Sequence, residues 1–282
     1  MLTLAQLIKL VLDESYQDID APDDAAKDAA IERELARLTD SYGHLKDRTR
    51  VEIDYSSPVG RFAYIYKYTV AHADYIKQLI ELTSPLQRLF DGNEVSVACL
   101  GGGPGSDLLG ILKYMIRNRK TSTLTCYLFD RERAWGDSWS EVARPLEANF
   151  QLYPVFQQMD VTDRTTWTAY SKFLRADLFT LSYFLSEVWT FKAQAEPFFD
   201  HCFRRAKPGA YFLFVDNNDA GGEFVQWYDS LAAAHGVERI AGRACHMAFS
   251  IEEEKRDLEP YYSKFGWPKR GSNVAIRIGR KR

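Results

Sequence analysis

The chain has 282 residues, which allows one large domain or a domain with an appendage, since domains commonly hold about 100–200 residues. Hydrophobic residues make up 46% and charged residues 27%, as in soluble globular proteins whose core is large enough to need no disulfides. Because 36 Lys and Arg stand against 39 Asp and Glu, the net charge of -3 excludes a protein that holds nucleic acid mainly by bulk positive charge. This net charge does not exclude a local basic patch.

The cysteines and the apolar runs indicate a reduced protein without a membrane span. The four cysteines stand at positions 99, 126, 202 and 245, too far apart for a CxxC pair or a zinc site. We expect buried thiols and no metal. Lys9 interrupts the apolar start of the chain, Asp13 and Glu14 follow it, and no run of 18 apolar residues exists elsewhere. We therefore expect a cytoplasmic location.

Helices are predicted for the first 90 residues. Apolar residues with helical spacing lie between Leu4 and Val11, and a second helix is expected to open at Pro22 and to end at Gly43. The stretch 44–57 is polar. A third helix follows, with Ser57 as its cap, and runs to Ser84-Pro85. We expect residues 1–90 to form a helical cap, followed by a second unit at 91–282.

In that second unit, short apolar runs alternate with helical patterns. Strands are expected at 95–100, 122–129, 154–159, 177–184 and 210–215. Helices are expected near 106–119, 137–150, 163–174, 190–206 and 222–234. This alternation is typical of a parallel sheet covered on both faces. Two late strands, IAGRACHMAFS and NVAIRIGR, have no ordinary helix between them. The prediction is a doubly wound, seven-stranded, mostly parallel sheet with an antiparallel last strand.

The strongest motif is CLGGGPGSD, which directly follows the first expected strand and opens a helix. Glycines permit positive φ and a close approach of a ligand, and the helix offers free N–H groups to it. The spacing is G-x-G-x-G, at Gly101, Gly103 and Gly105. It is not the dinucleotide pattern, because Ser106 stands where that pattern needs its last glycine. The phosphate-loop motif is absent. A turn that merely opens a helix, without a ligand, is the alternative.

This motif resembles the first motif of the class I S-adenosylmethionine-dependent methyltransferases. The resemblance implies a Rossmann-like fold and S-adenosylmethionine as cofactor. The loop residues implied to contact it are Leu100, Gly101, Gly102, Gly103, Gly105 and Asp107. In one respect the sequence departs from the family, since Cys99 stands where the family often has an acid. Backbone carbonyls or Asp107 would then contact the methionyl ammonium.

Two further acidic positions match the family pattern. Asp130 ends the second expected strand, where the resemblance implies a carboxylate that accepts both ribose hydroxyls, with Arg131 beside it. Asp160 ends the third strand, where it and Val161 are implied to face the adenine. An Asp at a strand end is also a common turn former. Helix capping, by Thr162 or Asp163, competes with the cofactor role at the third strand.

The fourth strand brings Ser182, Tyr183 and Glu187 to the position where the family places residues near the transferred methyl group. Methyl transfer needs alignment and sometimes a base, but no covalent nucleophile. Glu187 is the candidate base and Tyr183 a wall or hydrogen-bond donor; a helix N-terminal acid is the alternative for Glu187. The Asn/Asp-Pro-Pro-aromatic tetrapeptide of many amino-group methyltransferases is missing.

Aromatic residues make up 14% of the chain and suggest an enclosed acceptor pocket. The candidate pocket residues are Arg61, Tyr64, Tyr68, Trp135 and Trp189. Tyr64 and Tyr68 share a face of the third helix, whereas Tyr66 lies about 160° away. Packing in the core is the alternative reading for each ring.

The acceptor itself stays open. SPVGRFAYIYKY and DLFTLSYFLSEV loosely resemble segments of ribosome-associated methyltransferase-like proteins, which would make RNA the acceptor. The residues that fit are Arg61, Tyr64, Ser182, Leu185 and Glu187. The acidic balance and the aromatic cap favour a small molecule instead. A binding or scaffold protein that has lost catalytic activity is an alternative of another class, because a fold does not determine chemistry.

Overall fold

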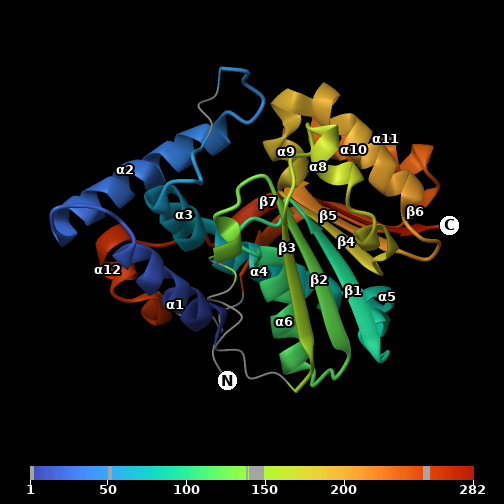
Figure 1. The fold of residues 1–282 in the computed structure, drawn as a ribbon, viewed down its shortest axis with the longest axis horizontal. Coiled ribbons are helices and arrows are strands. Elements are labelled where there is room, and N and C mark those ends of the chain that lie inside the picture. Colours follow the sequence, from blue (N-terminus) through green and yellow to red (C-terminus); the bar gives the residue numbers. More distant parts are fainter. Residues whose placement is uncertain (1–2, 50–52, 138, 140–148, 250–254) are drawn as a thin grey trace.

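The computed structural model describes residues 3–49, 53–137, 139, 149–249 and 255–282 (Figure 1). The helix expected near 137–150 lies largely outside these residues. None of the helices in the described ranges is long and apolar enough to cross a membrane.

Seven strands form one sheet in the order β3-β2-β1-β4-β5-β7-β6. Their bounds are β1 Glu94–Leu100, β2 Thr123–Asp130, β3 Leu152–Gln158, β4 Leu178–Ser182, β5 Tyr211–Asn217, β6 Val237–Ala248 and β7 Gly271–Lys281. The first five strands run parallel, while β7 pairs antiparallel with both β5 and β6. The predicted seven-stranded sheet with an antiparallel last strand is thus confirmed.

Helices cover both faces of the sheet because the side chains of its inner strands alternate between two cores. In β1, Val95 and Val97 pack into one core, and Ala98 and Leu100 pack into the other. The first core lies under α4 Val70–Glu81, α5 Ser84–Leu89 and α6 Ser106–Arg117. The second lies under α8 Arg164–Thr168, α10 Lys192–Arg205 and α11 Glu223–Ala234. The short α9 Phe184–Glu187 follows β4 directly.

The N-terminal helices are α1 Leu4–Gln17, α2 Asp24–Gly43 and α3 Pro58–Tyr64, and a π turn at Ile65–Thr69 joins α3 to α4. The expected start of the second helix at Pro22 is wrong by two residues, because the Asp23 carboxylate caps the helix by accepting from Ala26 N at 2.8 Å. The third helix continues through the π turn to residue 81.

The segment between β6 and β7 returns to these N-terminal helices, as Figure 1 shows for α12 beside α1. α12 spans Tyr261–Phe265, and a 3₁₀ turn spans Lys255–Leu258. Tyr261 Oη donates to Asp13 at 2.9 Å, and Thr3 Oγ1 donates to Asp257 at 2.9 Å. Segments from both ends of the chain therefore build the helical layer. The division of the chain at residue 90 stays a prediction.

A buried ionic cluster joins α4 to α6. Asp74 is fully buried, and its carboxylate lies 3.4 Å from both Lys77 Nζ and Lys113 Nζ. Gln78 Nε2 donates to the same carboxylate at 2.7 Å. Without the Asp74 carboxylate, the two lysine ammonium groups would lose the negative charge that lies between them in the protein interior.

We expect Asp74→Ala to destabilise the protein by about 3–5 kcal/mol, because removing one partner of a buried ion pair is strongly destabilising. Lys77 keeps its contact with Glu81, 3.7 Å away, but both lysines lose the buried carboxylate. Asp91→Ala is the matched control, since it removes the partner of Lys120 at an exposed site and is expected to cost about 1 kcal/mol or less. Urea unfolding of both variants measures the difference. Equal costs would contradict a structural role for the Asp74 cluster.

Candidate cofactor and acceptor site

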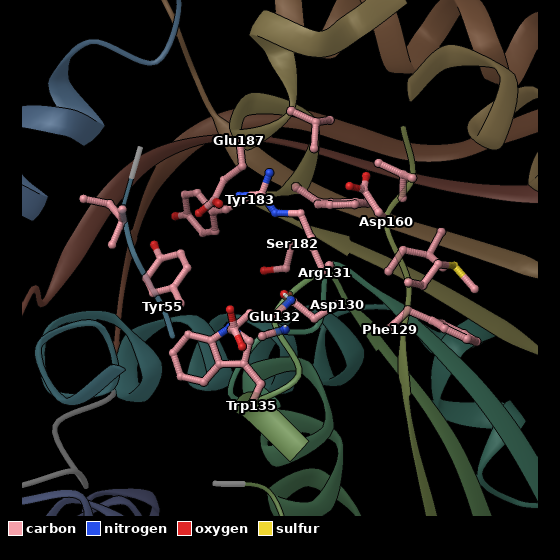
Figure 2. Close-up of a pocket in the computed structure, with 18 of the residues that line it drawn as sticks. Tyr55, Phe129, Asp130, Arg131, Glu132, Trp135, Asp160, Ser182, Tyr183 and Glu187 are labelled. Atoms are coloured by element: carbon pink, nitrogen blue, oxygen red, sulfur yellow. Dashed lines mark hydrogen bonds between the residues drawn. The ribbon is translucent and has the colours of Figure 1, made fainter. Parts of the chain in front are cut away.

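A pocket opens where the carboxyl ends of β1, β2, β3 and β4 meet the N-terminal helices. Figure 2 shows Asp160 and Phe129 at one side of it, Tyr55 and Glu187 at the other, and Ser182 between them. Ligands bind in this crevice of open α/β sheets. The residues predicted for the cofactor that line the pocket are Leu100, Gly101, Gly103, Asp130, Arg131, Asp160, Val161, Ser182 and Tyr183.

The glycine loop adopts the conformation that its spacing predicts. Gly101, Gly103 and Gly105 have φ of 65°, 46° and 81°, a region that other residues rarely adopt. Gly105 precedes the first residue of α6 and is its N-cap. An added Cβ at Gly103 would lie 3.8 Å from Asp130 Oδ2 and 4.0 Å from Trp135 Nε1, in ordinary van der Waals contact with both. Gly102 and Gly105 lie behind the loop surface, outside the pocket lining.

Asp130 lies at the end of β2 and accepts two backbone hydrogen bonds. Gly103 N donates to Oδ2 at 3.0 Å, and Glu132 N donates to Oδ1 at 2.9 Å. Burial raises the pKa of Asp130 to about 7; the hydrogen bond from Glu132 opposes this rise and the charge of Glu187 adds to it. This carboxyl is therefore held by the glycine loop and titrates near neutral pH.

Asp107 is not at the pocket surface. It lies in the first turn of α6, is buried under the loop, and accepts a hydrogen bond from Thr180 Oγ1 of β4. Burial raises its pKa to about 6, while Thr180 and Ser182 lower it. Cys99 is fully buried as well, with its Sγ 3.6 Å from Cys126 Sγ. The carboxyl of Asp107 thus lies beneath the glycine loop instead of facing the pocket.

Ser182 lies at the end of β4 and lines the pocket. Its hydroxyl is buried and interacts with the Asp107 carboxyl group, whose pKa it helps to lower. Ser182 thus connects the pocket wall to the carboxyl group beneath the glycine loop.

Asp160 and Val161 line the other side of the pocket with Phe129 and Met159. Asp160 Oδ1 accepts from Thr162 N at 2.8 Å and from Thr162 Oγ1 at 2.7 Å, which forms a tight turn. Asp163, not Asp160, caps α8 by accepting from Thr165 N at 2.9 Å. The capping role weighed for this stretch therefore falls on Asp163, while the cofactor role of Asp160 and Val161 stays a prediction.

Tyr183 has a positive φ of 56° and turns its ring onto the imidazole of His72. The ring centroids lie 4.0 Å apart and the planes are 12° from parallel. Burial lowers the pKa of His72 well below its ordinary value, so this imidazole is neutral. Tyr183 thus forms a wall of the pocket, and its buried hydroxyl interacts with Ser272.

Glu187 ends α9 and faces aromatic residues of the N-terminal helices. Tyr42 Oη, from the end of α2, donates to Glu187 Oε1, and Tyr55 Oη lies 2.8 Å from Tyr42 Oη. Because Tyr42 gives its only proton to Glu187, Tyr55 is the donor in the second bond. The sequence analysis did not assign Tyr42 and Tyr55 to the site. The one feature that could have indicated them is their position, since Tyr42 comes just before the polar stretch 44–57 and Tyr55 lies within it.

The predicted acceptor-pocket residues separate into two groups. Tyr64 and Trp135 line the pocket, with ring centroids 5.8 Å apart. Tyr68 lies behind Tyr42 and Tyr64, with centroids 5.2 and 5.3 Å away. Tyr66 packs on the other side, against Phe265, as the helical spacing predicts.

Arg61 and Trp189 also lie outside the pocket lining. Arg61 Nη1 donates to the carbonyls of Tyr55 and Ser56 at 2.9 and 2.7 Å, so it holds the loop that carries Tyr55. Trp189 packs edge-on against Phe224 and Trp227, with centroids 5.2 and 5.9 Å away. Among the described residues, no three His, Cys, Asp or Glu side chains gather to form a metal site.

Solved structures share this fold. A protein from Listeria monocytogenes assigned to the class I S-adenosylmethionine-dependent methyltransferases superposes with a TM-score of 0.52 at 13% identity, over 98% of this chain and 87% of that one. The CurJ carbon methyltransferase has a TM-score of 0.49 at 11% identity, over 90% and 67% of the two chains. The 16S rRNA methylase ArmA has 0.44 at 9% identity, over 89% and 98%.

At the level of sequence, no family model matches the chain and no curated protein is similar to it. The strand order and the similarity to the Listeria structure show that the chain has the Rossmann-like fold of the class I methyltransferases. At sequence identities this low, structural similarity supports the fold only. The reaction and the acceptor have to be inferred from the residues of the site.

The packing of the glycine loop yields a matched comparison. Gly101 and Gly222 have φ of 65° and 64°, so alanine meets the same backbone strain at both. At Gly101 the new Cβ would lie 2.1 Å from Phe184 Cδ2, whereas at Gly222 nothing is closer than 3.5 Å. We expect Gly101→Ala to cost about 1–3 kcal/mol more unfolding free energy than Gly222→Ala. Denaturant titration measures both, and a difference near zero would refute the packing.

Proposed function

We propose that this protein is an S-adenosylmethionine-dependent methyltransferase whose acceptor is a small molecule. The observation that carries the proposal is the meeting of the three-glycine loop and Asp130 at one pocket, with Gly103 N bonded to that carboxylate. Gly101, Gly103 and Ser182 line the same pocket as this carboxylate.

The residues present suit the parts of the cofactor. Asp130 would accept the ribose hydroxyls, since an ionised carboxylate accepts two such bonds. Phe129, Met159 and Val161 offer an apolar wall for the adenine, with Asp160 at its rim. When bound, S-adenosylmethionine supplies a methyl group already activated by a sulfonium centre.

The chain would then contribute alignment and exclusion of water. Tyr183 forms a wall, Glu187 is the candidate base, and the N-terminal helices cover that end of the pocket. This enclosure by Tyr42, Tyr55 and Tyr64 supports a small acceptor over a large nucleic acid.

Calorimetry tests the cofactor assignment. We expect S-adenosylmethionine and S-adenosylhomocysteine to bind wild type, and Asp130→Ala to weaken both by about tenfold or more, because charged hydrogen bonds contribute about 1.5–3 kcal/mol. Absence of binding at millimolar ligand would overturn the enzyme and favour a scaffold role for this fold. Unaltered affinity in the variant would overturn the ribose contact alone.

Cofactor affinity should also depend on pH. The ionised Asp130 is the form that accepts ribose hydroxyls, and its pKa is raised by burial to about 7 in the unliganded protein. Binding must release a proton at low pH, so affinity falls by about tenfold from pH 8 to pH 6 and levels off above pH 8. Asp130→Asn should bind weakly with a flat profile, and the exposed Asp20→Asn should follow wild type. A flat wild-type profile would contradict this role.

A further inference from the structure

At the end of the pocket next to Glu187, aromatic rings and a carboxylate lie together that are not assigned to the cofactor. We propose that Tyr42, Tyr55, Tyr64, Trp135 and Glu187 bind the methyl acceptor as a small ammonium ion. This inference rests on the proposed methyltransferase function and names its acceptor class. We call these five residues the amine subsite.

The first argument is the aromatic enclosure. Tyr55 and Tyr64 meet edge-on with centroids 5.3 Å apart, and Trp135 lies 5.2 Å from Tyr55 and 5.8 Å from Tyr64. Tyr42 extends the row, 6.3 Å from Tyr64. All four rings line the pocket. Ring faces arranged in this way attract cations within about 6 Å of their centroids, and quaternary ammonium groups most typically.

The second argument is the fixed carboxylate. Glu187 accepts from Tyr42, which in turn accepts from Tyr55, so the tyrosine hydroxyls orient it toward the rings. Burial raises the pKa of Tyr42, Tyr55 and Tyr64 well above their ordinary value, and the Glu187 charge raises each further. The phenols therefore stay neutral, and the carboxylate supplies the negative charge of the amine subsite.

The third argument is the charge of the whole lining. Among the described residues that line the pocket, five are acidic, and Arg131 is the single cation. The acidic residues are Asp54, Asp130, Glu132, Asp160 and Glu187. The sulfonium cofactor carries one net positive charge, so an excess of negative charge remains when it is bound. A cationic acceptor is attracted by this lining, whereas the phosphates of RNA are repelled.

Recognition and chemistry agree at Glu187. An amine nitrogen accepts a methyl group only through its lone pair. A bound ammonium must first transfer one proton to the Glu187 carboxylate, which leaves a neutral amine and a carboxylic acid. The same group that attracts the cation thus takes its proton.

Choline and 3,3-dimethyl-1-butanol test the amine subsite, because the second replaces the nitrogen of the first by carbon at the same shape. Calorimetry is done on the full chain with and without saturating S-adenosylhomocysteine. We expect choline to bind about tenfold tighter than the alcohol. Equal affinities, or no measurable binding of either, overturn the inference.

Variants locate the effect. Glu187→Gln should reduce the preference for choline to about threefold or less while the alcohol binds as before. Glu196→Gln removes the same charge from an exposed position on α10, outside this pocket, and should leave the preference intact. An unchanged preference in Glu187→Gln would overturn the assignment of the subsite. Tight binding of RNA fragments to the wild type, together with no preference for choline, would also overturn it, in favour of a polyanionic acceptor.

The binding of S-adenosylhomocysteine, measured alone, separates this inference from the proposed function. If the cofactor product binds and the choline preference is absent, the methyltransferase proposal stands and the amine subsite falls. If the cofactor product does not bind, the proposed function falls, whatever the probes do.

Discussion

Parallel pairing of β3, β2, β1 and β4 is the constraint on which the rest of the structure depends, because it brings four carboxyl ends to one edge of the sheet. The glycine loop, Asp130, Asp160 and Ser182 are far apart along the chain and meet only through this register. Residue Leu100 pairs with Phe129, so the loop after β1 reaches the acid after β2. Without the shared edge, none of these groups would face a common ligand.

The helical layer then decides what kind of pocket this edge becomes. Tyr42 from α2 donates its hydroxyl proton to Glu187, and Tyr55 from the following loop bonds to the hydroxyl of Tyr42. Arg61 holds the Tyr55 loop by its carbonyls, and α12 ties the layer to the far end of the chain. The π turn at Ile65–Thr69 directly follows Tyr64, which lines the pocket, and such turns are often found at functional sites. Burial raises the pKa of Tyr42, Tyr55 and Tyr64 in this layer well above the ordinary value.

Much of the fold could be predicted because its signals are local. Near-continuous apolar runs predict buried strands, and glycines at alternate positions predict a loop of positive φ, which Gly101, Gly103 and Gly105 show. The site was only partly accessible in this way. Asp130 follows from its place at a strand end, whereas Asp107 turns toward Thr180 because the first turn of α6 lies on β4. Tyr42 and Tyr55 could not be assigned, since Tyr42 bonds to Glu187, 145 residues away along the chain, and Tyr55 bonds to Tyr42.

By itself, the sequence determined the order of strands and helices, the antiparallel last strand, and the identity of the glycine loop with its following acid. Periodicity and spacing encode these features within short windows of the chain. Only the tertiary structure decided which aromatic rings surround Glu187, that Tyr68, Trp189 and Arg61 stay outside the pocket, and that the lining is acidic. The physical reason is that a pocket is formed by packing between distant segments, and no local pattern specifies which side chains that packing leaves exposed to a ligand.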